Sequence, residues 1–216
     1  MREVPGKIIW SVNRVDKCLI IFVEGYTEIE FYKKIIEEAK QHRTGKTFNT
    51  YIEYENVKGV GGFKNNALRK FIKSIKLKYD KNCEFNIALC RDTDIFEIAE
   101  KPPIDWNSVE KAFYDNGAQK VIHIKAKRCI EDWFLYDLDG ILDFLHLPKN
   151  TKPNGGNGCE KLKSLFRKVN KIYYKGSKSS NMVSHLNIDI IVEHVYKELS
   201  PLYETLEVKR DEKRKK

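Results

Sequence analysis

The sequence has little of what marks several common classes of protein. Its 5 cysteines are widely scattered and show no CxxC spacing, which argues against a zinc ribbon or a disulfide framework and fits a reducing compartment. The longest apolar run, residues 18–23, is far shorter than the roughly 20 residues that a membrane-spanning helix needs. The first ten residues, MREVPGKIIW, contain no long apolar signal segment. We therefore expect a cytoplasmic protein without a membrane partner.

Several catalytic signatures are missing as well. No segment matches GxxxxGK[ST], which argues against ATP hydrolysis by this chain. No GxSxG motif or Cys/His pair indicates a nucleophile, and the 5 histidines show no metal-ligand spacing. These absences leave the carboxylates as the candidate metal ligands.

The charge of the chain favours an anionic partner. Forty Lys and Arg face 31 Asp and Glu, which gives a net charge of +9, and a positive field concentrates polyanions near a surface. The last nine residues, VKRDEKRKK, carry +4 of this charge. This tail is either a solvated extension or an electrostatic arm for nucleic acid.

The pattern of apolar residues predicts an α/β domain. Compact or alternating apolar segments typical of strands are followed by segments of helical periodicity in regular alternation. The expected strands are residues 18–24, 47–57, 85–94 and 119–128, and the expected helices are residues 27–42, 63–80 and 106–117. This order predicts a mostly parallel four-stranded sheet flanked by helices.

After the fourth strand the periodicity stays helical. We expect helices over 129–147, 158–174 and 187–206, and we expect Pro201 to kink or end the last of them. The chain length suits one domain of ordinary size with an appended helical piece. The predicted division is an α/β domain over residues 1–147 and a helical extension with a basic tail over residues 148–216.

Acids follow two of the predicted strands. Glu24 ends the first strand, and Asp92 and Asp94 end the third. Ligands of open parallel sheets collect outside the carboxyl ends of the strands, so these acids are expected in one crevice. They would repel one another unless they were protonated or shared a cation, and carboxylate oxygens suit Mg²⁺ or Mn²⁺. An Asx turn explains Asp92 and Asp94 equally well when they are taken alone, and helix-dipole complementation explains Glu24.

A glycine-rich loop, KGVGGFKN, follows the second strand and precedes a helix. The backbone N–H groups of Gly61 and Gly62 could cradle a phosphate there, and Lys64 would favour a nucleic-acid backbone nearby. The alternative is a tight turn that packs the helix on the strand.

Three segments together resemble a known family. FVEGYTEIEFY (22–32), ALCRDTD (88–94) and CIEDWFLYDL (129–138) resemble the Toprim domain, the metal-dependent module of topoisomerases, primases and certain nucleases. The resemblance is nearest in character to bacterial anti-phage, abortive-infection Toprim nucleases of the OLD type and to proteins similar to RloB. KIYYKGSK (171–178) is a fainter match. A Toprim-like fold is what this resemblance implies.

The resemblance also implies roles for single residues. Glu24 matches the glutamate of the family, taken there as general acid/base or metal-linked, and Glu28 matches the second acid of the nucleases. Asp92 and Asp94 match the metal-binding DxD, and Glu131 stands where nucleases often add a metal ligand. Apart from the resemblance, Lys175 could lie against a phosphate as a point charge, or it could be an ordinary exposed lysine.

These features predict a Mg²⁺-dependent Toprim nuclease that cleaves phosphodiester bonds of DNA or RNA. By analogy alone it would be the effector of an anti-phage system, and a separate ATPase of the ABC or SMC-like kind would be its sensor. Homo-oligomer formation is a further possibility. The alternatives are a non-catalytic Toprim-fold module that binds nucleic acid or a partner, and, less favoured, a primase- or topoisomerase-like activity.

Overall fold

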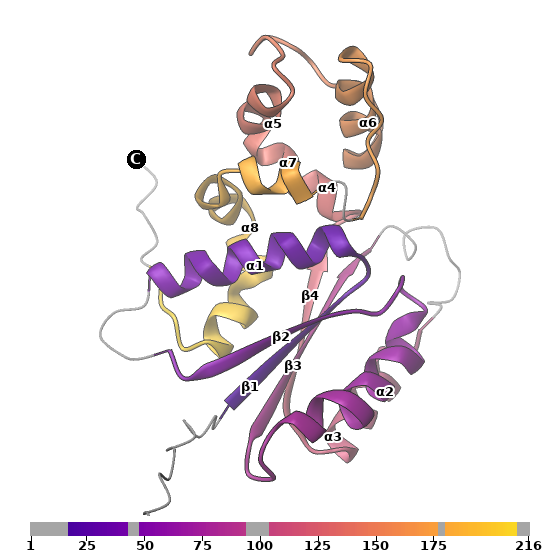
Figure 1. The fold of residues 1–216 in the computed structure, drawn as a ribbon, viewed down its shortest axis with the longest axis vertical. Coiled ribbons are helices and arrows are strands. Elements are labelled where there is room, and N and C mark those ends of the chain that lie inside the picture. Colours follow the sequence, from indigo (N-terminus) through magenta and orange to yellow (C-terminus); the bar gives the residue numbers. More distant parts are fainter. Residues whose placement is uncertain (1–16, 43–47, 94–103, 177–179, 211–216) are drawn as a thin grey trace, which may run out of the picture.

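The structure is a computed structural model that describes residues 17–42, 48–93, 104–176 and 180–210. Four strands form one parallel sheet in the order β2-β1-β3-β4. The strands are β1 (Lys17–Val23), β2 (Thr50–Asn56), β3 (Glu84–Asp92) and β4 (Ala118–Ala126). The predicted four-stranded parallel α/β architecture is therefore confirmed (Figure 1).

The apolar run of β1 reflects its central place in the sheet. β1 pairs with β2 on one side and with β3 on the other, so that Ile21 lies between Tyr54 and Ala88. Every residue of β1 after Lys17 is buried. A parallel strand covered on both faces needs apolar side chains in both directions, which is why the segment shows no alternation.

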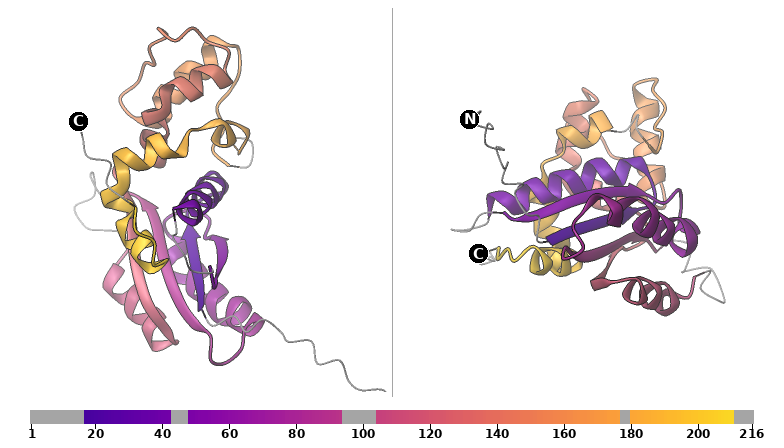
Figure 2. Two further views of the ribbon diagram at one scale, coloured as in Figure 1. Left: turned by 90° about the vertical axis from the view of Figure 1, so that its left-hand side faces the viewer. Right: turned by 60° about the horizontal axis from the view of Figure 1, so that its bottom comes forward.

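Helices cover both faces of the sheet, and the strand order determines which helix lies on which face. The connection from β1 to β2 runs in one direction, and the next two connections run in the other. Right-handed crossovers then place α1 (Tyr26–Gln41) on one face and both α2 (Leu68–Lys70) and α3 (Trp106–Asp115) on the other. Both views of Figure 2 show these layers. α2 is the centre of a longer helical segment, with π-helical turns at Phe63–Ala67 and Phe71–Ile75 and a 3₁₀ turn at Lys76–Lys78.

In the described part of the chain, five further α-helices follow the sheet. They are α4 (Ile130–Phe134), α5 (Leu138–Phe144), α6 (Gly158–Lys168), α7 (Ser180–His185) and α8 (Ile188–Thr205). α4 to α7 lie beyond the carboxyl edge of the sheet, and α8 returns to pack on β4 and α1 (Figure 1). The core on the α1 side continues from the sheet into these helices, so buried contacts cross the predicted boundary at residue 147. No helix within the described ranges is long and apolar enough to cross a membrane.

The helix predicted over 129–147 is interrupted by a buried aspartate. Asp137 lies in a 3₁₀ turn between α4 and α5, where its Oδ1 accepts a hydrogen bond from Gly140 N at 3.1 Å and its Oδ2 accepts one from Asn187 N at 2.6 Å. One carboxylate thus caps α5 and also holds the residue before α8. In α8 the non-helical dihedral angles occur at Val195, and the helix continues through Pro201 to Thr205.

Candidate functional site

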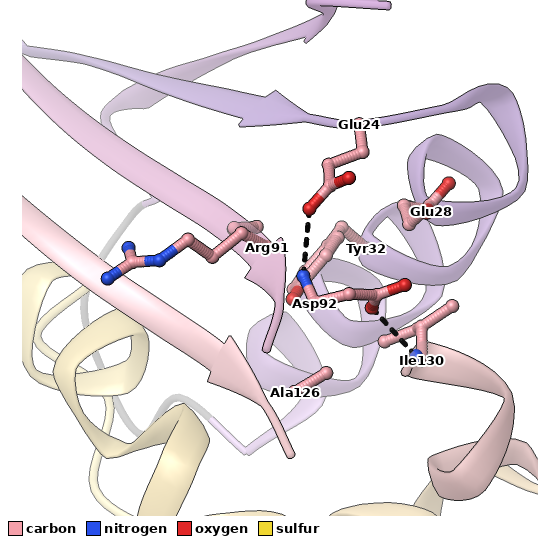
Figure 3. A pocket seen from close by; sticks show the side chains of 8 residues that line it. Glu24, Glu28, Tyr32, Arg91, Asp92, Ala126 and Ile130 are labelled. Carbon is pink, nitrogen blue, oxygen red and sulfur yellow. Dashed lines mark hydrogen bonds between the residues drawn. The ribbon is translucent and has the colours of Figure 1, made fainter. Parts of the chain in front are cut away.

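Two acids meet where the order of the strands reverses. β1 and β3 are neighbours in the sheet, and their following connections leave in opposite directions, which makes the gap between their carboxyl ends the usual ligand position of an open α/β sheet. Glu24 follows β1, and Asp92 is the last residue of β3. Glu24 Oε1 accepts a hydrogen bond from Asp92 N at 2.9 Å (Figure 3). The predicted proximity of these two residues is confirmed.

Two more acids enter this crevice from helix starts. Glu28 lies in the first turn of α1, and Glu131 lies in the first turn of α4. Both side chains are buried, and Glu131 is 0% exposed. The start of α4 is fixed to β3 because Asp92 Oδ1 accepts a hydrogen bond from Ile130 N at 2.8 Å (Figure 3). The partial positive charge of a helix N-terminus favours an acid in the first turn, but it does not neutralise four carboxylates.

Among the described residues, Lys175 brings a cation into contact with this cluster. Its Nζ lies 3.1 Å from Glu131 Oε2 and 3.5 Å from Asp92 Oδ2. The segment 171–176 is held beside the site at two points: the Tyr173 hydroxyl donates to Glu131 Oε1 at 3.1 Å, and Gly176 N donates to Thr27 Oγ1 at 2.7 Å. The structure therefore brings together Glu24, Glu28, Asp92, Glu131 and Lys175, whereas Asp94 lies outside the described residues.

The pKa values of the buried acids and of Lys175 are shifted by burial and by their mutual interactions. Burial raises the pKa of Asp92 to about 8; Lys175 opposes this shift, and the nearby acids, led by Glu24, reinforce it. Burial also raises the pKa of Glu28. For Lys175, burial lowers the pKa, but Glu131 and Asp92 outweigh burial and the pKa is raised overall. Burial is thus the main cause of the Asp92 and Glu28 shifts, whereas the acids around Lys175 determine the direction of its shift.

The donor set suits a hard divalent cation. All four acids offer only carboxylate oxygens, which are the ligands of Mg²⁺ and Mn²⁺. Glu131 Oε2 is buried and accepts no hydrogen bond from the described residues, although the ammonium of Lys175 lies beside it. In the described ranges no three of these carboxylates have oxygens within 4.8 Å of one another. Their side chains must therefore draw together to coordinate one ion.

Another group of possible ligands lies at the far end of α1. The ligand atoms of Glu38, His42 and Asp189 do lie within 4.8 Å of one another. A guanidinium already occupies this place, because Arg210 Nε lies 3.2 Å from Glu38 Oε1 and Arg210 Nη2 lies 3.3 Å from Asp189 Oδ1. The Tyr203 hydroxyl donates to the other oxygen of Glu38. We interpret this group as an ion-pair network that fixes the C-terminal segment to α1.

The glycine loop positions Glu24, and two of its backbone N–H groups are used inside the protein rather than left for a phosphate. Gly59 N donates to the Glu24 carbonyl oxygen at 2.8 Å, and Gly62 N donates to the Gly59 oxygen at 2.9 Å. The amide of Gly62 is thus engaged inside the loop. The phosphate-binding roles of Gly61 and Lys64 stay predictions.

Sequence reasoning missed two buried polar residues near the site, of which Tyr173 supports it directly. Tyr173 holds Glu131, and its only signal is its place two residues before Lys175. Arg91 is buried on the opposite side of β3 from Asp92, where its guanidinium lies 3.6 Å from the Trp106 ring centroid and donates to His123 Nδ1 at 2.6 Å. A charged residue within the apolar run of the third strand was the available signal.

Comparisons with protein-family models, with curated proteins and with solved structures found no match for this chain. What the site can do is therefore inferred from its own geometry and chemistry.

The loop offers a direct test of its packing. A Cβ at Gly62 would lie 1.9 Å from the Val57 carbonyl oxygen, whereas a Cβ at Gly61 would have no neighbour within 4 Å. We expect Gly62→Ala to lower the free energy of unfolding by about 1–3 kcal/mol, as overpacking does. Gly61→Ala is the matched control and should stay within about 0.5 kcal/mol of wild type. Urea unfolding measures both, and equal stability of the two variants would contradict the packing role.

The raised pKa of Asp92 has a measurable consequence for stability. Between about pH 4 and pH 8 the native protein keeps a proton on Asp92 that the unfolded chain has released. The free energy of unfolding without divalent ions should therefore fall as the pH rises through this range, by at most about 1.4 kcal/mol per pH unit from this group. Asp92→Asn should flatten that slope. Urea unfolding across the range tests this, and an unchanged slope in the variant would contradict the assignment.

Proposed function

We propose that the protein is a Mg²⁺-dependent (or Mn²⁺-dependent) nuclease that hydrolyses phosphodiester bonds of DNA or RNA. One observation carries the proposal: four carboxylates, at the ends of two strands and the starts of two helices, converge at the switch point of a parallel sheet, with Lys175 among them. The strand order is consistent with a Toprim-like fold, and the resemblance of the three sequence segments to Toprim nucleases supports the same chemistry.

The acids of the cluster would hold the metal, and Lys175 would supply a positive charge to the phosphate. Asp92, Glu131 and Glu28 would hold the metal. Glu24 braces the end of β3 through the Asp92 amide, and its carboxylate would also serve as the general acid/base that the resemblance implies. A bound divalent ion supplies Lewis acidity and neutralises the charge that develops on the phosphate. Without metal, the raised pKa of Glu28 lets its carboxyl group keep a proton closer to neutral pH than an ordinary glutamate does, and metal binding would release that proton. Lys175 would contact the phosphate as a second positive charge.

The resemblance extends the proposal beyond the chemistry. Related Toprim nucleases act in bacterial anti-phage defence, often with an ATPase, and this chain contains no ATPase motif. We therefore propose a cytoplasmic effector that is controlled by a separate ABC or SMC-like ATPase sensor. This part depends on analogy with the family.

A second candidate is a non-catalytic module that binds nucleic acid or a partner. One observation favours it: Lys175 already supplies a cation to Asp92 and Glu131, so the acids are not without compensation when metal is absent. In that case the cluster would be a structural ion-pair network.

Cleavage assays separate the two candidates. The purified chain is incubated with plasmid, single-stranded DNA and tRNA in Mg²⁺, Mn²⁺ or EDTA, alone and with any ATPase that proves to be encoded beside its gene. We expect at least one substrate to be cut only when metal is present. Glu24→Gln should abolish cutting, and Glu198→Gln, an exposed change on α8, should not. Failure to cut any substrate under all these conditions would favour the binding module.

A further inference from the structure

Helix α6 presents a basic face that its packing does not require. Its buried side chains, Leu162, Leu165 and Phe166, enter the core. The exposed positions include Lys163, Arg167 and Lys168. The only acid on this helix, Glu160, is engaged at its start, where its Oε2 accepts a hydrogen bond from Gly156 N at 2.7 Å. The exposed side is therefore positive from Lys163 to the end of the helix.

In the part of the chain that the structure describes, an acidic neighbour compensates some lysines at the surface of the molecule, but not the cations of this helix face. Lys33, Lys111 and Lys149 each lie within 2.8 Å of a carboxylate oxygen. Within the described ranges, no ion pair involves Lys163, Arg167, Lys168 or Lys171. Like charges held together without counter-charges destabilise a fold, so such a group is typical of a surface that binds an anion.

The segment after α6 leads from this face to the carboxylate cluster. It begins with exposed Lys171 and reaches Lys175, whose ammonium contacts Asp92 and Glu131. The segment contains no regular helix, and Tyr173 points inward to Glu131. Figure 1 shows α6 beyond the carboxyl edge of the sheet, on the side where this site lies.

Apolar side chains stand exposed beside the cations. Ile172 and Tyr174, on either side of the buried Tyr173, are 67% and 50% exposed. Tyr26 is 55% exposed and precedes Thr27, which is hydrogen-bonded to Gly176. Exposed aromatic rings among cations are the pattern by which proteins bind unpaired bases, since every base has a face that stacks on a ring. In a duplex these faces are covered by neighbouring bases.

We propose that the basic face of α6 and segment 171–176 bind single-stranded nucleic acid and lead it to the carboxylate cluster. This inference rests on the proposed function, because it treats the cluster as the place where the strand is cut. It makes the substrate class a single strand of DNA or RNA in preference to a duplex.

Binding measured without cleavage tests the proposal. Fluorescence anisotropy in EDTA, over a series of salt concentrations, follows a labelled single strand of about 20 nucleotides and the matched duplex. The test variant is Lys163→Gln/Arg167→Gln/Lys168→Gln. The control is Lys81→Gln/Lys120→Gln/Lys197→Gln, which removes the same charge from exposed positions on other elements. Circular dichroism checks that both variants are folded.

We expect the test variant to bind the single strand at least about tenfold more weakly than wild type. Each lost phosphate contact should lower the slope of log K against log salt by roughly 0.7, so three lost contacts should lower it by about 2. The control should bind nearly as wild type. Tyr174→Ala should weaken the single strand several-fold more than the duplex. Equal losses in test and control variants, preference for the duplex, or binding through α6 only to vesicles of anionic lipid would each overturn the inference.

The outcomes also separate this inference from the proposed function. If the protein binds single strands through α6 but never cuts them, the proposed binding surface is supported and the proposed nuclease function is refuted. If the test variant binds single strands as wild type does and still cuts in the presence of metal, the proposed nuclease function is supported and the proposed binding surface is refuted.

Discussion

Asp92→Asn should abolish metal-dependent cleavage while leaving the protein folded. Asp92 sits at the centre of the cluster: its amide holds Glu24, its Oδ1 holds the start of α4, and its Oδ2 faces Lys175. Residues that merely orient metal ligands already cost 10- to 100-fold when they are changed, so loss of a direct ligand should cost roughly 100-fold or more in rate. Initial cleavage rates at saturating Mg²⁺ measure the effect.

The stability of this variant distinguishes a lost ligand from a damaged fold. The amide oxygen of Asn can still accept the hydrogen bond from Ile130 N, and the substitution removes a buried charge that repels its neighbours. We therefore expect an unfolding free energy at pH 8, without metal, that is equal to or higher than that of wild type. Asp143→Asn, an exposed change on α5, is the control for both measurements. A variant that cuts as fast as wild type would remove Asp92 from the site.

Lys175→Met should destabilise the metal-free protein and make it depend on divalent ions. Glu131 is 0% exposed, and removal of Lys175 leaves its carboxylate buried without a compensating charge. Breaking a buried ion pair costs about 3–5 kcal/mol. Because 46% of the Lys175 side chain is exposed, we expect a smaller loss, roughly 1–3 kcal/mol. Urea unfolding in EDTA measures it, and Mg²⁺ should restore more stability to this variant than it adds to wild type.

A double-mutant cycle isolates the interaction. Lys175→Met combined with Glu131→Gln removes both charges, so the double variant should be more stable than Lys175→Met alone. Lys111→Met, whose partner Asp115 is exposed, should change stability by no more than about 0.5 kcal/mol. Additive losses in the cycle would show that Lys175 and Glu131 are not coupled.

Local pattern was sufficient to predict the sheet and two sides of the site. The unbroken apolar run of β1 and the acids at the ends of β1 and β3 are consequences of parallel pairing, which the sequence expresses within a few neighbouring residues. The predicted helix 27–42 agrees with α1 to within one residue at each end. The placement of Glu28 beside the strand end follows from that agreement.

The features that were missed depend on contacts between residues far apart in the chain. The helix predicted to end at residue 174 ends at Lys168, and the segment that follows is pinned by the hydrogen bond from Tyr173 to Glu131. The interruption before α5 follows from a hydrogen bond between Asp137 and Asn187. The short helix α7 was not expected. Helical periodicity carries no information on such contacts, so the C-terminal half was predicted less well than the sheet.

Direct binding of Mn²⁺ tests the metal site most sharply, because it needs neither a substrate nor an activating partner. Electron paramagnetic resonance counts the bound ion in wild type, in Asp92→Asn and in Glu38→Gln, which alters the network at the far end of α1. A metal centre at the carboxyl edge of the sheet predicts binding to wild type and to Glu38→Gln, and loss of binding in Asp92→Asn. Wild type that binds no Mn²⁺, or binding that is lost in Glu38→Gln and kept in Asp92→Asn, would contradict it.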